Sequence, residues 1–126
     1  MDVVTVLVAL EGVDINQADR NGQTVLFIAS GNGHLDVVKV LLGVEGMNVV
    51  NQATVGGEEG DGYTPLAASI MAGRIDVARL LLQQPNIEVN KGGEEWSPLE
   101  LAKEYMVDIV QVLVDAGAVG RTEEGR

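Results

Sequence analysis

The 126-residue sequence repeats itself, and this internal repetition restricts the possible folds more than any other feature. Three short blocks recur in a constant order. The first is Gly-x-Thr-Val-Leu or a close variant, at residues 22–26, 62–66 and 95–99. The second is an aliphatic run, at residues 35–42, 75–82 and 107–114, and the third is an Ile/Val-Asn pair, at residues 15–16, 50–51 and 89–90. A period of about 33 residues, with one interval seven residues longer, predicts a stacked array of similar units.

Capping residues predict that the first block of each unit opens a short helix. Thr24, Thr64 and Ser97 stand at N-cap positions, where a side-chain hydroxyl accepts a hydrogen bond from an amide of the first turn. Pro65 and Pro98 follow directly, at the first helical position, where a missing amide hydrogen costs nothing. The spacing therefore predicts a helix after each of these caps.

Glycines predict where the first helix of a unit stops and the second begins. Gly33 and Gly73 are expected to end it in the left-handed conformation that glycine adopts without strain. A second helix with a dense aliphatic face then starts near His34 or Arg74. The Gly- and Asn-rich segments between units predict turns or hairpins.

A unit of one hairpin and two helices resembles the ankyrin repeat, whose pattern is Gly-x-Thr-Pro-Leu-His-x-Ala, then Gly-His and a Val-Val-x-Leu-Leu run. The matching residues are Gly22, Thr24, Leu26, Ala29, Gly33, His34 and 37–42 in one unit, and Gly62, Thr64, Pro65, Leu66 and Gly73 in the next. The resemblance covers about residues 2–119 and implies an all-α, ankyrin-type solenoid. It implies a partial repeat at residues 2–18, full repeats at about 19–53, 54–91 and 92–119, and a polar, disordered tail at 120–126.

The sequence departs from the ankyrin pattern in three places. The His that follows Thr-Pro-Leu is replaced in every unit, by Phe27, Ala67 and Glu100. We expect Glu100 to take over some of its hydrogen bonds. The last unit lacks the glycine between its helices, and residues 54–60 lengthen one hairpin.

Composition excludes several classes of function. Eight basic and 19 acidic residues give a net charge of −11, which opposes nucleic acid phosphates and anionic membrane surfaces. The sequence has no Cys, a single His and no apolar run long enough to span a bilayer. We therefore expect no metal, no cofactor, no membrane span and no enzyme activity. His34 is expected to be a turn residue hydrogen-bonded to nearby backbone.

Aromatic and acidic residues gather on neighbouring hairpins. Tyr63 and Trp96 occupy the same position in adjacent units, just before the helix cap, so their rings are expected side by side. One hypothesis is an acidic and aromatic groove for a basic or amphipathic segment of another protein, because aromatic residues dominate interface energies and opposite charge speeds encounter. The alternative is that the rings only cover the stems of the hairpins.

The ankyrin resemblance implies that hairpin ends and first helices form a concave face that binds a partner protein. Transferred to this sequence, and extended by the acidic residues of the adjacent hairpins, it predicts these contact residues: Arg20, Asn21, Gln23, Asn32, Glu58, Glu59, Asp61, Tyr63, Met71, Glu94, Glu95, Trp96 and Glu104.

The two ends of the array differ in polarity. Val3–Leu10 predicts an almost wholly apolar helix, whereas terminal repeats normally turn a polar face outward. Either the chain is a fragment of a longer array, or another molecule covers this face, including a second copy. The other end is expected to be finished by Lys103, Glu104, Asp108, Gln111 and Asp115.

These observations predict a non-enzymatic protein-binding module. The alternatives are a structural, spacer or regulatory segment of a longer ankyrin-repeat protein, and self-association through Val3–Leu10. The resemblance and the lack of a signal peptide imply an intracellular location.

Overall fold

The computed structural model describes residues 16–44, 47–54, 62–91 and 97–118. Within these ranges it contains six α-helices and one 3-10 helix, and no strand. The expected all-α repeat fold is confirmed. The sequence predictions for the Val3–Leu10 helix and the 120–126 tail fall outside the described residues.

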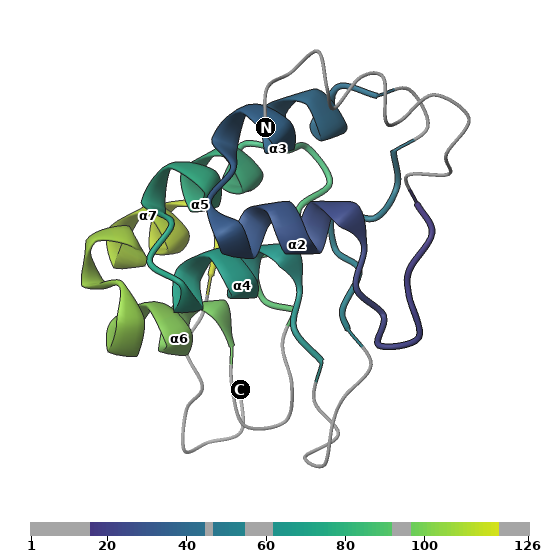
Figure 1. Cartoon of the computed structure of the whole chain (residues 1–126). Coiled ribbons are helices and arrows are strands. Elements are labelled where there is room, and N and C mark those ends of the chain that lie inside the picture. Colours follow the sequence, from purple (N-terminus) through teal and green to yellow (C-terminus); the bar gives the residue numbers. More distant parts are fainter. Residues whose placement is uncertain (1–15, 45–46, 55–61, 92–96, 119–126) are drawn as a thin grey trace.

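The helices alternate between two layers (Figure 1). The first helices of the units are α2 (Val25–Asn32), α4 (Pro65–Met71) and α6 (Pro98–Tyr105). The second helices are α3 (Leu35–Leu42), α5 (Ile75–Leu82) and α7 (Val110–Asp115), the last preceded by the 3-10 helix η1 (Val107–Ile109). Helix α4 lies between α2 and α6, and it also packs on α5. Each helix pair therefore contacts mainly its neighbours in the stack.

The predicted N-caps are all present. The Thr24 hydroxyl accepts a hydrogen bond from the Phe27 amide at 3.1 Å, and Thr64 accepts one from Ala67 at the same distance. Ser97 accepts from the Glu100 amide at 3.3 Å, and its own hydroxyl donates to the Glu100 carboxylate. These bonds satisfy first-turn amides that have no partner inside the helix.

The turns between the helices of a unit contain the predicted left-handed glycines and the histidine. Gly33 and Gly73 both have φ of +75°; Gly33 directly follows α2, whereas Gly73 lies two residues beyond the end of α4. The amide of His34 donates to the Ala29 carbonyl at 3.1 Å. His34 is therefore a turn residue hydrogen-bonded to nearby backbone, as expected, while its exposed imidazole makes no capping hydrogen bond to α3.

The last unit shows what its missing glycine does. Helix α6 ends at Tyr105, and the φ of −154° and ψ of 73° of the following residue, Met106, are far from helical. The chain then enters the second helix through one 3-10 turn. In the two earlier units the second helices, α3 and α5, begin directly as α-helices. The last second helix, at six residues, is shorter than its equivalents at eight.

The core between the layers is almost entirely aliphatic. Each first helix contributes a buried leucine at the same position, Leu26, Leu66 and Leu99, and each second helix contributes another, Leu41, Leu81 and Leu113. Small residues such as Ala29 and Ala78 complete the contact. Because only 3% of the residues are aromatic, the core rests on branched side chains of similar size.

Asparagine side chains connect consecutive units. The Asn51 amide group accepts a hydrogen bond from the Glu88 amide and donates one to the Asn86 carbonyl, both at 2.8 Å. The asparagines that end the neighbouring units also reach forward, Asn16 accepting from the Asn48 amide at 2.9 Å and Asn90 donating to the Gly117 carbonyl at 3.4 Å. The recurring Asn of the sequence is therefore a link between repeats.

The C-terminal end of the array is less polar than the sequence predicts. Lys103, Glu104, Asp108, Gln111 and Asp115 are all exposed, as expected. Apolar side chains are exposed beside them: Tyr105 is 51%, Val107 69% and Val114 45% exposed. The expectation of a finished polar end is wrong to that extent, because the positions of Val107 and Val114 are only half-buried in the earlier units and lose their cover here.

Candidate protein-interaction surface

The tip of the hairpin before α2 is organised by a single carboxylate. The side chain of Asp19 accepts hydrogen bonds from the amides of Asn21 and Gln23 at 2.8 and 2.9 Å. Its backbone amide donates to the Gln23 carbonyl at 3.0 Å, and Gly22 supplies a left-handed turn with φ of +78°. This closed turn presents Arg20 and Asn21 to solvent, as predicted for contact residues. The sequence analysis missed Asp19, which its position ahead of a glycine turn could have suggested.

The hairpin before α4 is pinned at its stem by two hydrogen bonds. The Thr54 amide donates to the Tyr63 carbonyl, and the Tyr63 amide donates to the Thr54 hydroxyl, both at 2.9 Å. Gly62 makes this approach possible, since a Cβ there would lie 1.6 Å from the Thr54 carbonyl oxygen. The two hydrogen-bonded segments of this stem therefore fix the direction in which residue 63 enters α4.

Tyr63 is half-buried at that point and packs against the core. This position agrees with an aromatic ring that covers the hairpin stem, and it leaves part of the ring accessible. The other residues of the predicted acidic and aromatic groove lie outside the described residues: Glu58, Glu59, Asp61, Glu94, Glu95 and Trp96.

The first helices carry further contact candidates beyond the hairpins. Residues four apart lie on one face of a helix, so positions 27 and 31, 67 and 71, and 100 and 104 form three parallel rows. Phe27 and Glu100 are half-buried in these rows, and Ala67 is fully buried. The rows differ in their side chains. The row on α2 is apolar, the row on α4 is also apolar and ends at Met71, and the row on α6 consists of two carboxylates. Phe27 is a contact candidate that the sequence analysis treated only as a replaced histidine.

The predicted contact residues fall into two groups along these rows. Arg20, Asn21, Gln23 and Tyr63 lie at the hairpin end, and Asn32, Met71 and Glu104 lie at the other end of the first helices. Met71 is 37% exposed, and Asn32 and Glu104 are exposed. An eight-residue helix is about 12 Å long, so a partner that touches both groups must span at least that length.

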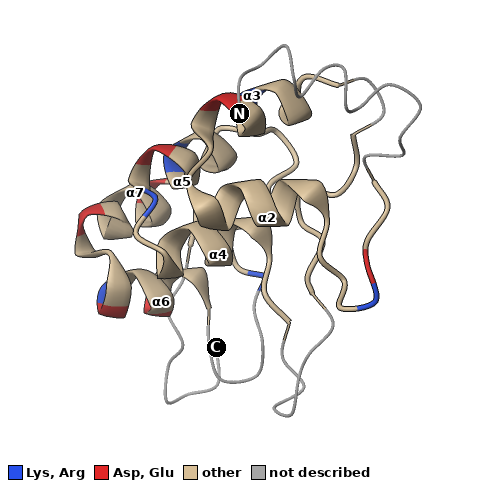
Figure 2. Cartoon of the chain, viewed as in Figure 1, with Lys and Arg blue, Asp and Glu red and all other residues tan. Residues whose placement is uncertain are grey.

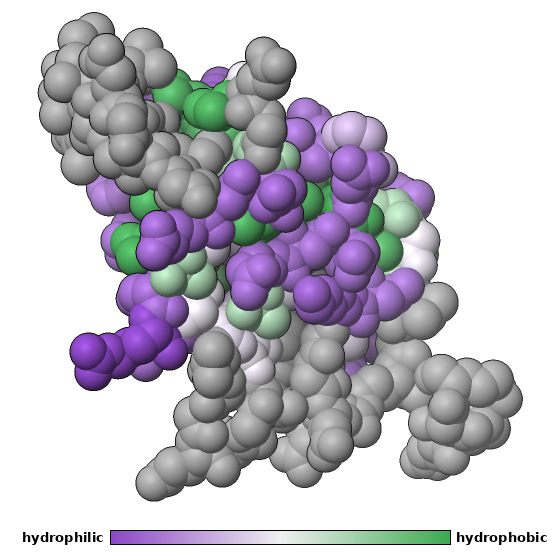
Figure 3. All heavy atoms as spheres, turned by 90° about the vertical axis from the view of Figure 1, so that its right-hand side faces the viewer, coloured by the Kyte–Doolittle hydropathy of each residue, from purple (hydrophilic) through white to green (hydrophobic). Residues whose placement is uncertain are grey.

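Charged residues are distributed unevenly over the described surface (Figure 2). Asp36 and Asp76 occupy the first turns of α3 and α5, where they complement the positive end of the helix dipole. On α6, Glu100 and Glu104 flank Lys103. On the side of the molecule seen in Figure 3, hydrophilic side chains cover most of the described surface, with smaller hydrophobic areas between them.

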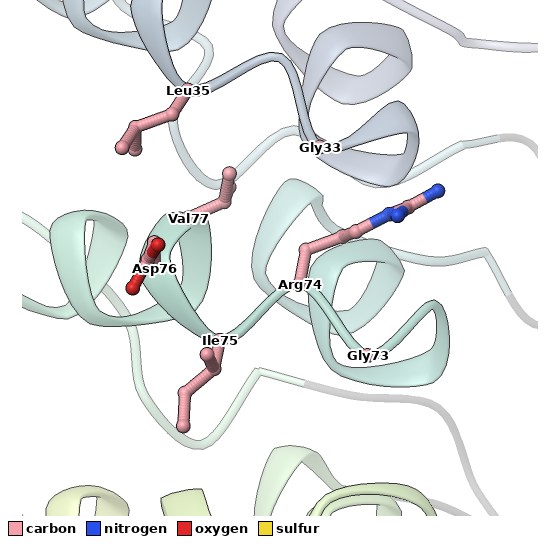
Figure 4. Close-up of a pocket in the computed structure, with 7 residues that line it drawn as sticks. All are labelled: Gly33, Leu35, Gly73, Arg74, Ile75, Asp76 and Val77. Carbon is pink, nitrogen blue, oxygen red and sulfur yellow. The ribbon is translucent and has the colours of Figure 1, made fainter.

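A shallow pocket of about 200 Å³ lies between the second and third units, at the end remote from the hairpins (Figure 4). Its lining includes Leu35, Ile75 and Asp76. Arg74 crosses from one unit to the other and donates from Nε to the Gly31 carbonyl at 3.2 Å. Its stem covers Gly33 so closely that a Cβ there would come within 2.8 Å of the Arg74 Cδ. The pocket is therefore the margin of an inter-repeat contact.

The described residues were compared with the requirements of a metal site and of a membrane span. No group of three or more His, Cys, Asp or Glu among them could hold a metal ion. No helix in the described part of the chain is long and apolar enough to cross a membrane.

Ser30 is fully buried, and its hydroxyl has no hydrogen-bond partner.

The comparisons with known proteins agree with the helix pairs and their capping. A family model described as ankyrin repeats (3 copies) matches residues 1–93 and again residues 46–124. The chain belongs to the ankyrin repeat family. Ankyrin repeats generally mediate protein–protein interaction, and the family is typically non-enzymatic.

A curated relative is the "BTB/POZ domain-containing protein 1" of Schizosaccharomyces pombe, 31% identical to this chain over 110 residues. The match covers 84% of the chain but only 8% of that relative. The chain therefore spans only a small part of the length of that relative.

Proposed function

We propose that this ankyrin repeat domain binds a partner protein through its hairpin tips and the concave face of its first helices, and that it favours a basic or amphipathic segment. The observation that carries the proposal is the change in side-chain type across the three rows, from apolar on α2 and α4 to acidic on α6. Phe27 and Met71, both partly exposed, occupy these rows on α2 and α4, and the carboxylates Glu100 and Glu104 occupy the row on α6. A segment with an apolar side and a cationic end matches that order.

The charge of the whole chain supports the preference for a basic segment. A net charge of −11 attracts cationic partners over long distance and raises the association rate, although it adds less to the lifetime of the complex. The lifetime depends on buried apolar contacts, which Met71, Phe27 and the accessible part of Tyr63 supply in this proposal. Salt should therefore slow association more than it speeds dissociation.

The proposal is tested by selecting binders from a peptide library displayed against the purified chain and measuring their kinetics by biolayer interferometry. Met71→Asp should accelerate dissociation by about tenfold, because it places a charge in an apolar contact. Glu104→Lys should slow association with cationic peptides. Asp115→Lys is the matched charge reversal on the second-helix layer and should change dissociation very little.

Trp96→Ala addresses the hairpin part of the surface. If Trp96 and Tyr63 form one contact area, this substitution weakens peptide binding while the unfolding midpoint stays unchanged. Selected peptides without a cationic excess, or binding that neither Met71→Asp nor Trp96→Ala alters, would contradict the proposal.

A further inference from the structure

Met71 is the most exposed of the three methionines in the described part of the chain. Its side chain is 37% exposed at the last position of α4, whereas Met106 is 8% exposed and belongs to the aliphatic core. Met47 lies between these extremes, since it is half-buried and packs against the core. Solvent therefore reaches the thioether of Met71 most readily.

The residues at the same position of the neighbouring first helices account for this exposure. Gly31, Met71 and Glu104 each follow their N-cap by seven residues, and α4 packs between α2 and α6. Gly31 has no side chain that could cover the thioether, and the Glu104 carboxylate is exposed to water. Met71 thus lies between one position without a side chain and one with a charged side chain.

An accessible thioether is the form of methionine that peroxides oxidise. The sulfur lone pair attacks one peroxide oxygen, the O–O bond breaks, and hydrogen peroxide yields the sulfoxide and water. Methionine sulfoxide reductase reverses the change with electrons from two thiols, which become a disulfide as water is released. The sulfoxide is polar and accepts hydrogen bonds, so oxidation changes the row on α4 without adding a net charge.

We propose that Met71 is a peroxide-sensitive modification site, and that reversible oxidation of its sulfur controls partner binding by the first helices. The control rests on the proposed function, in which Met71 supplies an apolar contact. A sulfoxide at this position replaces that contact by a hydrogen-bond acceptor, so an apolar side chain of the partner loses its packing. Because Met71 is exposed, its oxidation leaves the core intact, whereas oxidation of Met106 places a polar group inside it.

The first measurement maps oxidation along the folded chain. The purified 126-residue protein is treated with dilute hydrogen peroxide, digested with trypsin and followed by mass spectrometry. Residues 40–74 form one tryptic peptide that carries both Met47 and Met71, so fragment ions compare these two sites directly. Met71 should oxidise on the order of tenfold faster than Met106, with Met47 between them, and the difference should vanish in guanidinium chloride.

The second measurement follows the dissociation of the selected cationic peptides by biolayer interferometry. Oxidation should accelerate it by on the order of tenfold, in proportion to the Met71 sulfoxide, and the reductase with dithiothreitol should restore the original rate. Met71→Leu is the matched variant, because leucine keeps the apolar volume and has no sulfur, so its binding should be insensitive to peroxide. Met106→Leu should keep the sensitivity of the parent chain.

Each outcome decides the proposal. Preferential oxidation of Met71, a reversible loss of binding that Met71→Leu abolishes, and an unchanged urea unfolding midpoint support it. Oxidation of Met71 that is no faster than that of Met106 overturns the site. Peroxide sensitivity that persists in Met71→Leu, or a midpoint that falls with the Met71 sulfoxide, overturns the control of binding. If the parent chain binds none of the peptides, the proposed function fails and the control with it, while the oxidation map still decides the site.

Discussion

Asn51→Ala should destabilise the fold by removing a link between two repeats. The side chain makes two hydrogen bonds of 2.8 Å, one from the Glu88 amide and one to the Asn86 carbonyl. A typical intramolecular hydrogen bond contributes about 0.5–1.5 kcal/mol net, which gives roughly 1–3 kcal/mol for the pair. Asn51 is half-buried, so water can replace part of the loss, and we expect about 1–2 kcal/mol.

The assay is urea unfolding followed by far-UV circular dichroism, with thermal unfolding as a second measurement. For a chain of this length, 1 kcal/mol corresponds to a shift of about 4 °C in Tm, so Asn51→Ala should lower Tm by about 4–8 °C. The urea concentration at the unfolding midpoint should fall. The slope of the unfolding free energy against urea concentration should stay constant, because the same surface area is exposed on unfolding.

Asn48→Ala is the matched control in the same loop. Asn48 takes part in the neighbouring link through its backbone amide, which bonds to Asn16, so its side chain can be removed without breaking that bond. The control should stay within about 0.5 kcal/mol of the parent chain. If Asn51→Ala costs no more than Asn48→Ala, the asparagine links contribute nothing to stability and the reasoning fails.

Three further substitutions probe other contacts, each by urea unfolding against the parent chain. Ser30→Ala should stabilise the fold by about 1 kcal/mol, because it removes a buried hydroxyl that has no partner; a loss of stability would show that the hydroxyl is bonded in solution. Gly62→Ala should cost more than about 2 kcal/mol, since the added Cβ collides with the Thr54 carbonyl and separates the hairpin stem; a neutral result would mean that the stem relaxes freely. Thr64→Ala should cost about 1 kcal/mol through the lost cap to Ala67, and an unchanged midpoint would contradict the capping argument.

Local sequence signals predicted much of the fold, because repeats, caps and glycine turns are decided by neighbouring residues. The caps at Thr24, Thr64 and Ser97 and the left-handed Gly33 depend only on contacts within four residues, and all are observed. His34 lies in the turn as expected, but the orientation of its exposed imidazole is not determined by its neighbours in sequence, and that side chain makes no capping hydrogen bond to α3.

Contacts between units could not be derived in the same way. The recurring asparagine was visible in the sequence, but its partners lie in the next unit and depend on how the units stack. The exposure of Val107 and Val114 likewise depends on which neighbours are present and not on residue type. The contact residues themselves, including Arg20, Met71 and Trp96, remain predictions until a partner is measured.

The position of α4 gives the domain a stability gradient. Helix α4 has first-helix neighbours on both sides, whereas α2 and α6 each have one among the described residues. In a stack held by nearest-neighbour contacts, backbone amides in the middle unit exchange with solvent more slowly than those in the outer units. A ligand that contacts α4 alone would slow the exchange of backbone amides that already exchange most slowly. One that bridges α2 and α6 would suppress fraying at both ends, and would therefore change the cooperativity of unfolding as well as its midpoint.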